Sequence, residues 1–535
     1  MATLAWGLVL LLAGVAQGVA LAWPLQGVPF LPYGQPVAWL QWLALCVWVL
    51  AVRAAPSAKV AGLRSWLFAA AWLCATFWWL TISMTLFGGM PMVLAALAVG
   101  LLASALALYY GLVGALVWRW RAAGPWVQAA VVGAAWLLAE WARGRLLTGF
   151  PWGAVGYAQV DAWGLLAPWV GVYGLSALSA ALAAWVVARW GPASAGSAAV
   201  GRQRAKARRV WGTWPAWLLL PWMVWPAGST SLMPHLPGFT QSTGSMPVLL
   251  LQGNINQRDK FDAETGLKQA LQWYGDEIVA GVATLKTHEG LSLIVAPETA
   301  VPLLPSEVDA AWWKRLERAL GQGRSALMMG LPMGSWTEGY TNSVMAWNPS
   351  GQSYRYDKHH LVPFGEFVPP GFRWFVDAMG IPMTDFQRGP LGAKPLYWAG
   401  QRLAPNICYE DLFGEELAVL FKDPAHAPTV LVNVSNIAWF GNTVALDQHR
   451  HIARMRALEL ERPMVRATNT GSTAAIDHQG RVLAEAPRWE AATLEAVVDG
   501  REGLTPYARW VAAWGLWPLV ALALAVLALL WRRTR

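Results

Sequence analysis

Long apolar segments separated by short loops fill the first 228 of the 535 residues. Most are close to the roughly 20 residues that a helix needs to cross a bilayer. Only 13% of the residues are charged, against about 25% in soluble proteins. A signal peptide is the alternative for the first segment, but no Lys or Arg precedes it and further helices follow. We therefore expect a polytopic α-helical membrane protein with eight spans, near residues 4–21, 36–54, 65–86, 92–117, 125–142, 163–188, 210–227 and 508–531.

Basic residues are distributed unevenly among the loops. Loop 22–35 and segment 87–91 contain no Lys or Arg. Because loops rich in Lys and Arg face the cytoplasm, we expect both termini inside the cell and residues 229–507 outside it. The net charge of +9 then reflects topology and not nucleic-acid binding. The basic positions are Arg53, Lys59, Arg64, Arg119, Arg121, Arg202, Arg204, Lys206, Arg208, Arg209, Arg532, Arg533 and Arg535, with Arg143 and Arg145 as an exception on an outer loop.

These patterns divide the chain into three expected regions. Residues 1–228 are a membrane domain of seven transmembrane helices, 229–507 a periplasmic domain, and 508–535 an eighth transmembrane helix with a basic cytoplasmic tail. In the middle region, short apolar runs alternate with amphipathic segments, which is typical of an α/β domain with a layered sheet. The expected strands are 246–252, 291–296, 326–330, 343–347, 402–408, 429–434, 464–468 and 473–476, and the expected helices 264–287, 306–320, 415–420 and 447–460.

Three polar residues lie at expected strand ends in this region, two of them next to apolar runs. Cys408 ends the run 402–408, and a thiol at such a turn lies near backbone N–H groups that can bind an oxyanion. Glu298 follows the run 291–296, where a partly desolvated carboxylate can act as a base. Lys358 opens a proline-bounded aromatic loop and could donate to an oxyanion. A buried structural thiol, a solvated glutamate and a surface cation are the simple alternatives.

The order of these motifs is more specific than any one of them. Pro297-Glu298, then Lys358-x-x-Leu-Val-Pro-Phe-Gly-Glu366, then Cys408-Tyr409-Glu410 resembles the nitrilase superfamily, which uses a Glu-Lys-Cys triad on an α-β-β-α sandwich. With the apolar segments added, nearly the whole chain resembles the bacterial apolipoprotein N-acyltransferase family, which has eight spans and an extracytoplasmic nitrilase-like domain. The further matching motifs are Gly149-Phe150-Pro151-Trp152, Gln252-Gly253-Asn254-Ile255, Ala438-Trp439-Phe440-Gly441, 453–459, 466–471 and 503–507.

The resemblance implies a role for each matching residue. Glu298 is then the general base, Lys358 stabilises the oxyanion, and Cys408 is the acylated nucleophile. Two positions depart from the family pattern: Phe261 replaces an essential tryptophan, and Ile437 replaces an aspartate. Roles in substrate binding or in active-site loops are implied for Glu366, Tyr409, Glu410, Phe261 and Trp439.

The implied reaction is a transfer by ping-pong kinetics. An acyl chain passes from a membrane phospholipid, through a thioester on Cys408, to the α-amino group of a diacylglyceryl-cysteine at the N-terminus of an apolipoprotein. The alternative is a membrane-bound nitrilase-type amidase, which shares the triad and releases its product to water. A third hypothesis is a transporter with an inactive outer domain. It is disfavoured because the apolar segments are poor in charge, Glu140 being the clearest exception.

Metal and cofactor chemistry is not expected. The pairs His449/His451 and His359/His360 are not in a clear ligand register, so core or surface histidines are the simpler interpretation. Cys46 and Cys74 lie inside apolar segments, and no disulfide framework is visible. The Gly149–Trp152 run is either an interfacial turn anchored by aromatics or a floor under the outer domain.

Overall fold

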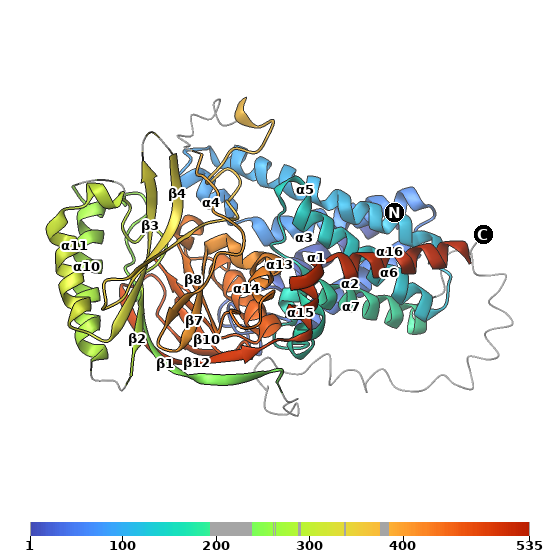
Figure 1. Cartoon of the computed structure of the whole chain (residues 1–535). Coiled ribbons are helices and arrows are strands. Elements are labelled where there is room, and N and C mark those ends of the chain that lie inside the picture. Colours follow the sequence, from blue (N-terminus) through green and yellow to red (C-terminus); the bar gives the residue numbers. More distant parts are fainter. Residues whose placement is uncertain are drawn as a thin grey trace. The chain divides into compact units, whose positions relative to one another are not determined.

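The computed structural model describes residues 2–192, 238–260, 262, 264–286, 290–335, 337, 339–374 and 385–533, and Figure 1 shows its elements. The chain divides into two compact units. A helical unit comprises Met1–Thr81, Pro91–His235 and Leu516–Arg535, and an α/β unit comprises Ile82–Met90 and Leu236–Gly515. The expected span 210–227, the basic residues of 202–209 and Phe261 lie outside the described residues.

Among the described residues, three helical segments are long and apolar enough to cross a membrane: Ala58–Phe77, Met92–Trp120 and Gly164–Trp190. Two shorter apolar helices, Ala5–Val19 and Ala38–Arg53, precede them. The eight expected spans are therefore matched only in part. The helices of the helical unit are α1 (Ala2–Val19), α2 (Ala38–Arg53), α3 (Ala58–Phe77), α5 (Met92–Val117), α6 (Pro125–Arg145), α7 (Ala167–Trp190) and α16 (Trp517–Arg532).

Two expected spans are interrupted. The span 65–86 ends at Phe77 with α3, and the short helix α4 (Leu80–Leu86) follows. The span 508–531 is divided between α15 (Pro506–Trp514) and α16. Gly515 lies between them with φ 58°, a left-handed conformation that ends a right-handed helix and suits glycine. If that bent pair counts as one span, the described residues contain four candidate spans.

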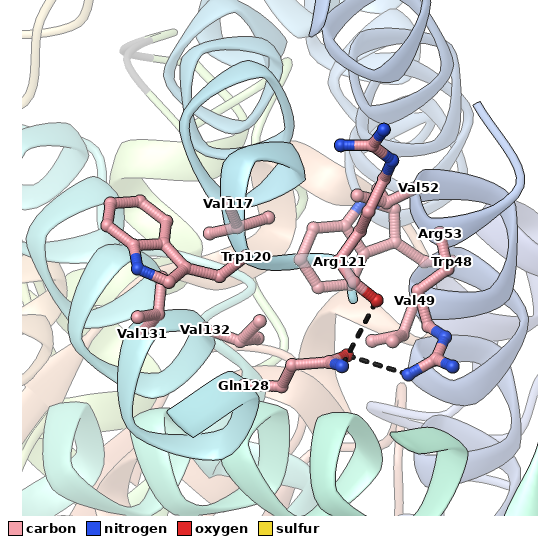
Figure 2. Close-up of a pocket in the computed structure, with 10 residues that line it drawn as sticks. All are labelled: Trp48, Val49, Val52, Arg53, Val117, Trp120, Arg121, Gln128, Val131 and Val132. Carbon is pink, nitrogen blue, oxygen red and sulfur yellow. Dashed lines mark hydrogen bonds between the residues drawn. The ribbon is translucent and has the colours of Figure 1, made fainter. Parts of the chain in front are cut away.

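Basic residues from separate loops meet at one end of the helical unit. Arg53, the last residue of α2, donates to Oε1 of Gln128 over 2.9 Å. Gln128 in turn donates to the carbonyl oxygen of Arg121 over 3.1 Å. Figure 2 shows these contacts around a small pocket lined by α2, the end of α5 and α6. The loops after α2 and α5, both expected to be cytoplasmic, therefore lie side by side.

The two ends of the chain reach the same region. The guanidinium of Arg64 lies over the ring of Trp6 in α1, at 5.1 Å from the centroid. The guanidinium of Arg119 lies over the ring of Trp531 in α16, at 4.5 Å. The beginning of α1 and the end of α16 thus lie beside the two basic loops.

Arg143 explains the exception to the charge pattern. Its side chain is 1% exposed and donates to the carbonyl oxygens of Phe150 over 2.6 Å and Trp152 over 2.7 Å. It also donates to the hydroxyl of Tyr110 over 3.1 Å. This arginine fastens the Gly149–Trp152 turn to α6 and is not a charge of a solvated loop.

The α/β unit contains two six-stranded sheets. In the first, with order β12-β1-β2-β3-β4-β5, the strands β1, β2 and β3 are parallel. In the second, with order β11-β10-β9-β8-β7-β6, the strands β7, β8 and β9 are parallel. The strands are β1 (Thr240–Gln252), β2 (Ser292–Val295), β3 (Ser325–Ser335), β4 (Gly339–Trp347), β5 (Ser353–Asp357), β6 (Leu396–Trp398), β7 (Gln401–Ile407), β8 (Val430–Ser435), β9 (Met464–Thr468), β10 (Ala474–Ile476), β11 (Val482–Glu485) and β12 (Ala492–Gly503).

Successive side chains of a strand point to opposite faces of the sheet, and in the first sheet both faces are apolar. Val248 and Leu250 of β1 face the second sheet and pack in one core with Ile407 of β7 and Val432 of β8. Leu249 faces the other way, toward α10 (Gly266–Leu285) and α11 (Ala310–Gly321). In Figure 1 these helices cover the first sheet, while α13 (Gly414–Ala418) and α14 (Ala445–Leu460) lie beyond the second. The expected α/β character of this region is confirmed.

Strand β12 is the main element missed from sequence. It pairs antiparallel with β1 over most of its length, at the edge of the first sheet. Its residues are largely half-exposed, and Glu495 and Asp499 interrupt the apolar residues. An edge strand with one solvent-exposed face has no continuous apolar run, so its hydropathy pattern does not clearly indicate a strand. The short strands β5, β6 and β11 were also not predicted.

Candidate active site

Cys408 stands directly after β7, as the first residue of a 3-10 turn over Cys408–Leu412. Its φ is 52°, a left-handed conformation that costs energy in a residue with a Cβ and is characteristic of functional turns. The turn is closed by its own glutamate: the backbone N–H of Ile407 donates to Oε2 of Glu410 over 2.6 Å. The geometry therefore presents the thiol at a sharp strand-to-turn corner.

Glu410 joins this corner to the loop that carries Lys358. Its Oε1 accepts the backbone N–H groups of His359, over 2.7 Å, and His360, over 3.1 Å. The Tyr356 hydroxyl donates to Oε2 over 2.8 Å. Burial raises the pKa of Glu410, while the hydrogen bonds from Ile407 and Tyr356 oppose that shift. The carboxyl group thus holds two loops in a fixed relation.

Lys358 lies just past β5 and is 1% exposed. Its Nζ is 2.9 Å from Oε2 of Glu366 and 3.4 Å from Oε1 of Glu298. Burial lowers the pKa of Lys358, but the carboxylates of Glu366 and Glu298 outweigh burial and hold that pKa above its ordinary value. The ammonium is therefore a permanent positive charge in the site.

Glu298 follows β2 and is 7% exposed. Oε1 accepts the Nδ2 amide of Asn342 over 2.7 Å, and Oε2 accepts the backbone N–H of Asn436 over 2.8 Å. The same amide also donates to Oε1 of Glu366 over 2.7 Å. Strand β3 passes so close that a Cβ at Gly330 would lie 2.6 Å from the Cα of Glu298, so this position requires glycine. The carboxylate of Glu298 is held rigidly.

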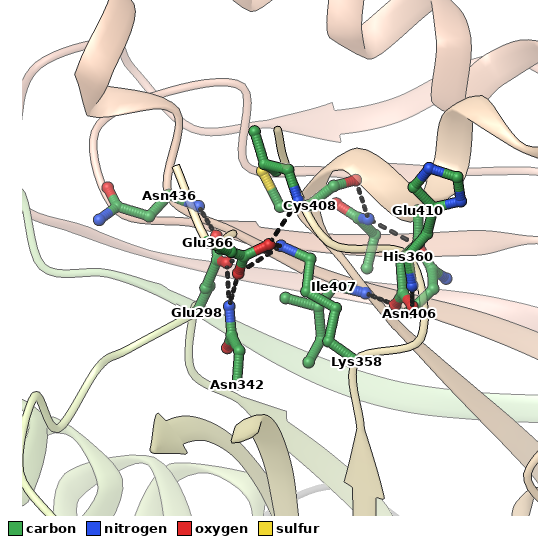
Figure 3. A network of polar contacts seen from close by, with 12 residues as sticks. Glu298, Asn342, Lys358, His360, Glu366, Asn406, Ile407, Cys408, Glu410 and Asn436 are labelled. Carbon is green, nitrogen blue, oxygen red and sulfur yellow. Dashed lines mark hydrogen bonds and ion pairs between the residues drawn. The ribbon is translucent and has the colours of Figure 1, made fainter. Parts of the chain in front are cut away.

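The three residues expected to form a triad meet in one polar cluster, shown in Figure 3. Burial, and next the charge of Glu298, raise the pKa of Cys408 to about 12, while Lys358 opposes that shift. The thiol therefore keeps its proton at neutral pH. A nucleophilic attack by Cys408 requires a base that removes the proton as the new bond forms, and Glu298 is a carboxylate in this cluster.

Of the other expected site residues, Glu366 lies within the polar cluster, whereas Tyr409 and Trp439 make aromatic contacts. Glu366 belongs to the cluster, and its Oε2 also accepts the backbone N–H of Val362 over 2.8 Å. Tyr409 is buried and packs edge-on against Phe413. Trp439 is 36% exposed and contacts Phe87 edge-on.

The position where the family pattern has aspartate is apolar here. Ile437 is fully buried, so its side chain fills this position with apolar atoms. In the part of the chain that the structure describes, no group of three or more His, Cys, Asp or Glu side chains is arranged to hold a metal ion.

His449 belongs to a buried ionic network beside the nucleophile turn. Its Nε2 lies 2.8 Å from Oδ1 of Asp411, and its Nδ1 accepts a hydrogen bond from Arg466 over 2.6 Å. Arg466 also bonds Oδ2 of Asp411 over 3.0 Å. Burial lowers the pKa of His449, which fits a neutral ring that donates to Asp411. Of the two simple alternatives that the sequence leaves open, a core or a surface histidine, His449 is the core one.

Two functional contacts were not foreseen from sequence. Asn342 carries the amide that bridges two carboxylates, and its signal is the buried polar run Thr341-Asn342-Ser343 inside strand β4. A buried amide in a strand must find hydrogen-bond partners.

The second contact is made by Lys260, which is 1% exposed. Its Nζ donates to the carbonyl oxygen of Glu298 over 3.5 Å. Its sequence context, a polar loop, resembles any surface lysine.

Comparisons with known proteins cover nearly the whole chain. The family model "Apolipoprotein N-acyltransferase N-terminal domain" matches residues 24–185, and "Carbon-nitrogen hydrolase" matches 250–507. A relative from Verminephrobacter eiseniae, "Apolipoprotein N-acyltransferase", is 48% identical over 96% of this chain and 94% of its own. One of the same name from Ralstonia nicotianae is 41% identical over 92% and 89%. Among solved structures, a CN-hydrolase superfamily protein from Xanthomonas campestris aligns with 51% of this chain and 96% of its own, at 16% identity and TM-score 0.36.

Proposed function

The chain belongs to the apolipoprotein N-acyltransferase family and is an acyltransferase, and from that premise we propose that Cys408, Glu298 and Lys358 carry out its reaction. The donor is a membrane phospholipid, and the acceptor is the α-amino group of a diacylglyceryl-cysteine at the N-terminus of an apolipoprotein. The observation that supports this assignment best is the carboxylate of Glu298, held by Asn342 and Asn436 beside the buried ammonium of Lys358.

In the first half-reaction, Sγ of Cys408 attacks the ester carbonyl of the phospholipid while Glu298 takes the thiol proton. Lys358 stabilises the oxyanion that forms on the carbonyl oxygen. The ester C–O bond then breaks, and Glu298 returns the proton to the departing glycerol oxygen. The products are a thioester on Cys408 and a lysophospholipid. The raised pKa of Cys408, about 12, is why the base is needed in this step.

In the second half-reaction, the amino group of the acceptor attacks the thioester. Glu298 takes a proton from the nitrogen, the C–S bond breaks, and the sulfur leaves as a thiol after protonation. An amide is released, and the enzyme returns to its starting state. Water would give a free fatty acid instead, which is the amidase-type outcome. Family membership favours the amine as acceptor.

The same proposal includes the membrane arrangement. We propose eight spans in the inner membrane of a bacterium, with a membrane domain over 1–228, a periplasmic catalytic domain over 229–507, and a last span and tail over 508–535. The meeting of Arg53, Arg121 and the two ends of the chain at one end of the helical unit supports placing that end in the cytoplasm. The catalytic unit then lies outside, where the lipid donor and the lipoprotein acceptor meet.

The test is direct detection of the acyl-enzyme. Purified protein in detergent is incubated with phosphatidylethanolamine, and its intact mass is measured. We expect one added acyl chain on Cys408, absent in Cys408→Ala and present in the matched variant Cys74→Ala. A diacylglyceryl-cysteine peptide should then discharge the adduct and become N-acylated. An adduct located elsewhere would refute the role of Cys408, and release of free fatty acid in place of the acylated peptide would favour the amidase.

A further inference from the structure

A row of buried polar residues crosses the second sheet where it meets the nucleophile turn, Cys408–Leu412. Asn406 of β7 is paired in register with Asn433 of β8, and Asn433 with Arg466 of β9; all three are fully buried. Val432 packs between the two sheets, so its neighbour Asn433 faces the other way. Nδ2 of Asn433 donates to Oδ1 of Asn406 over 2.6 Å and to the carbonyl oxygen of Cys408 over 3.4 Å. The row therefore contacts the residue that carries the thiol.

Asp411 of the turn and His449 of α14 form a triangle with Arg466. The guanidinium donates to Oδ2 of Asp411 over 3.0 Å and to Nδ1 of His449 over 2.6 Å. Nε2 of His449 lies 2.8 Å from Oδ1 of Asp411. Because an arginine can only donate, Nδ1 of His449 accepts, and Nε2 carries the proton that is donated to Asp411. Each of the three side chains is thus bonded to the other two.

Stability alone does not explain polar groups on this face of the sheet. Asp411 and Arg466 are an ion pair without exposed side-chain surface, and apolar residues of similar volume are often as stabilising as such a pair. The preceding row on the same face is in the same register and is apolar, with Ala404, Leu431 and Met464 all buried. The polar row is the one that adjoins the nucleophile turn, which indicates a task for its contacts beyond filling the interior.

The nucleophile turn is a segment that needs such support. Cys408 has a φ of 52°, a left-handed conformation that persists in a residue with a Cβ only where the surrounding structure holds it. Glu410 fastens the turn to the loop of Lys358. Asn433 and Asp411 fasten it to the second sheet and to α14. The turn is therefore held from two sides by separate sets of hydrogen bonds.

We propose that the triangle of Asp411, His449 and Arg466 holds the nucleophile turn in the conformation from which Cys408 attacks the acyl ester. These side chains act through the turn, so they are positioning residues. The inference rests on the proposed role of Cys408 as the nucleophile. Its consequence is that the hydrogen bonds of the triangle, and not the volume that it fills, set the rate of thioester formation.

The experiment replaces His449 by side chains with and without hydrogen-bonding groups. His449→Gln has an amide that can donate to Asp411 and a carbonyl oxygen that can accept from Arg466, whereas His449→Leu has neither. Formation of the acyl adduct on Cys408 is followed by intact mass, in single turnovers with phosphatidylethanolamine at increasing mole fraction in detergent. Rates are expressed per folded molecule, with the folded fraction taken from thermal unfolding.

We expect the maximal rate of His449→Leu to fall by about tenfold or more, the effect of lost hydrogen bonds to charged groups. The half-saturating mole fraction of phosphatidylethanolamine should stay unchanged. His449→Gln should remain within about threefold of the wild-type rate. His451 is also buried on α14 and contacts Arg454 of the same helix, so His451→Leu is the matched control and should keep the wild-type maximal rate.

Equal maximal rates in His449→Leu and His449→Gln would overturn the inference, because packing and not hydrogen bonding would then be what matters. A change confined to the half-saturating mole fraction would also overturn it, since the effect would lie in lipid binding. If His449→Leu does not fold, Asp411→Asn is the second variant, and a wild-type maximal rate in it would refute the role of the triangle. Wild-type protein that forms no adduct would instead refute the proposed function itself.

Discussion

The backbone N–H of Asn436 donates to Oε2 of Glu298 over 2.8 Å, although the two residues are 138 positions apart. Glu298 follows β2 of the first sheet, and Asn436 follows β8 of the second. This hydrogen bond therefore ties the two sheets together at the edge where the proposed base stands. Apart from proline, no substitution at Asn436 removes the backbone donor, so the side-chain donors to Glu298 are the ones that mutation tests most directly.

Asn342→Ala should slow acylation of Cys408. The variant removes the amide that donates to both Glu298 and Glu366, and a hydrogen bond to a charged group contributes about 1.5–3 kcal/mol. The expected loss is therefore about tenfold to a hundredfold in the rate of adduct formation. Asn348→Ala, in the turn after the same strand, should keep the wild-type rate. Equal rates in both variants would show that the bridging amide does not orient the base.

Glu298→Gln should abolish acylation and yet make Cys408 more reactive toward iodoacetamide. Burial is the largest cause that raises the pKa of Cys408, and the negative charge of Glu298 is the second largest. Its removal lowers that pKa and increases the thiolate fraction, by about tenfold for a shift of one pH unit. Peptide mapping after alkylation at pH 8 measures the rate at Cys408 separately from Cys46 and Cys74. Slower alkylation of Cys408 in this variant would contradict the expectation that the charge of Glu298 raises the pKa of Cys408.

Glu410→Gln should impair the site more than Tyr356→Phe does. A glutamine has one carbonyl oxygen, whereas Glu410 accepts the N–H groups of Ile407, His359 and His360. The nucleophile turn and the Lys358 loop would lose their common anchor, and we expect a rate loss of about a hundredfold, or roughly 3 kcal/mol. Tyr356→Phe removes one donor and should cost about tenfold or less. The reverse ranking in single-turnover rates would assign the anchoring to Tyr356.

Arg143→Lys should destabilise the helical unit in detergent. The guanidinium binds the carbonyl oxygens of Phe150 and Trp152 and the hydroxyl of Tyr110, and a lysine cannot reproduce that planar set of donors. We expect a loss of about 2–4 kcal/mol, because buried carbonyl groups lose their partners. The matched control is the exposed Arg145→Lys, with little change. Thermal unfolding measures both, and a normal melting temperature for Arg143→Lys would show that the turn holds without the arginine.

The meeting of Glu298 and Cys408 could be predicted because each follows or ends an apolar strand, whereas Lys358 follows β5, a half-exposed polar strand that the sequence does not predict. β2 and β7 belong to different sheets, and the packing of the two sheets brings the residues after their carboxyl ends into the cluster of Figure 3. Asn342 could not be assigned in the same way. It lies inside β4 on a strand that reverses direction, and its partners come from distant loops. Lys260 is similar, since its burial depends on tertiary packing.

The membrane half shows a different limit of sequence patterns. Hydropathy identifies apolar stretches but not where a helix breaks, so 65–86 and 508–531 each read as a single span. In the structure, α3 ends at Phe77 and Gly515 separates α15 from α16. The distribution of Lys and Arg also assigns Arg143 to a loop. The sequence alone does not distinguish an arginine that binds backbone carbonyl groups from an arginine in a solvated loop. The role of Arg143 follows only from the turn at Phe150–Trp152.

Helix α16 has a consequence for the order in which the protein is assembled during translation. Ala523 of α16 packs with Ala134 and Leu137 of α6, and the ring of Trp517 lies against that of Trp141 in a tilted contact. The face of α6 that receives them is made almost 400 residues before its partner, as the numbering shows. The helical unit can therefore close only after α16 has been made. A chain that lacks α16 would leave that apolar face of α6 without this cover.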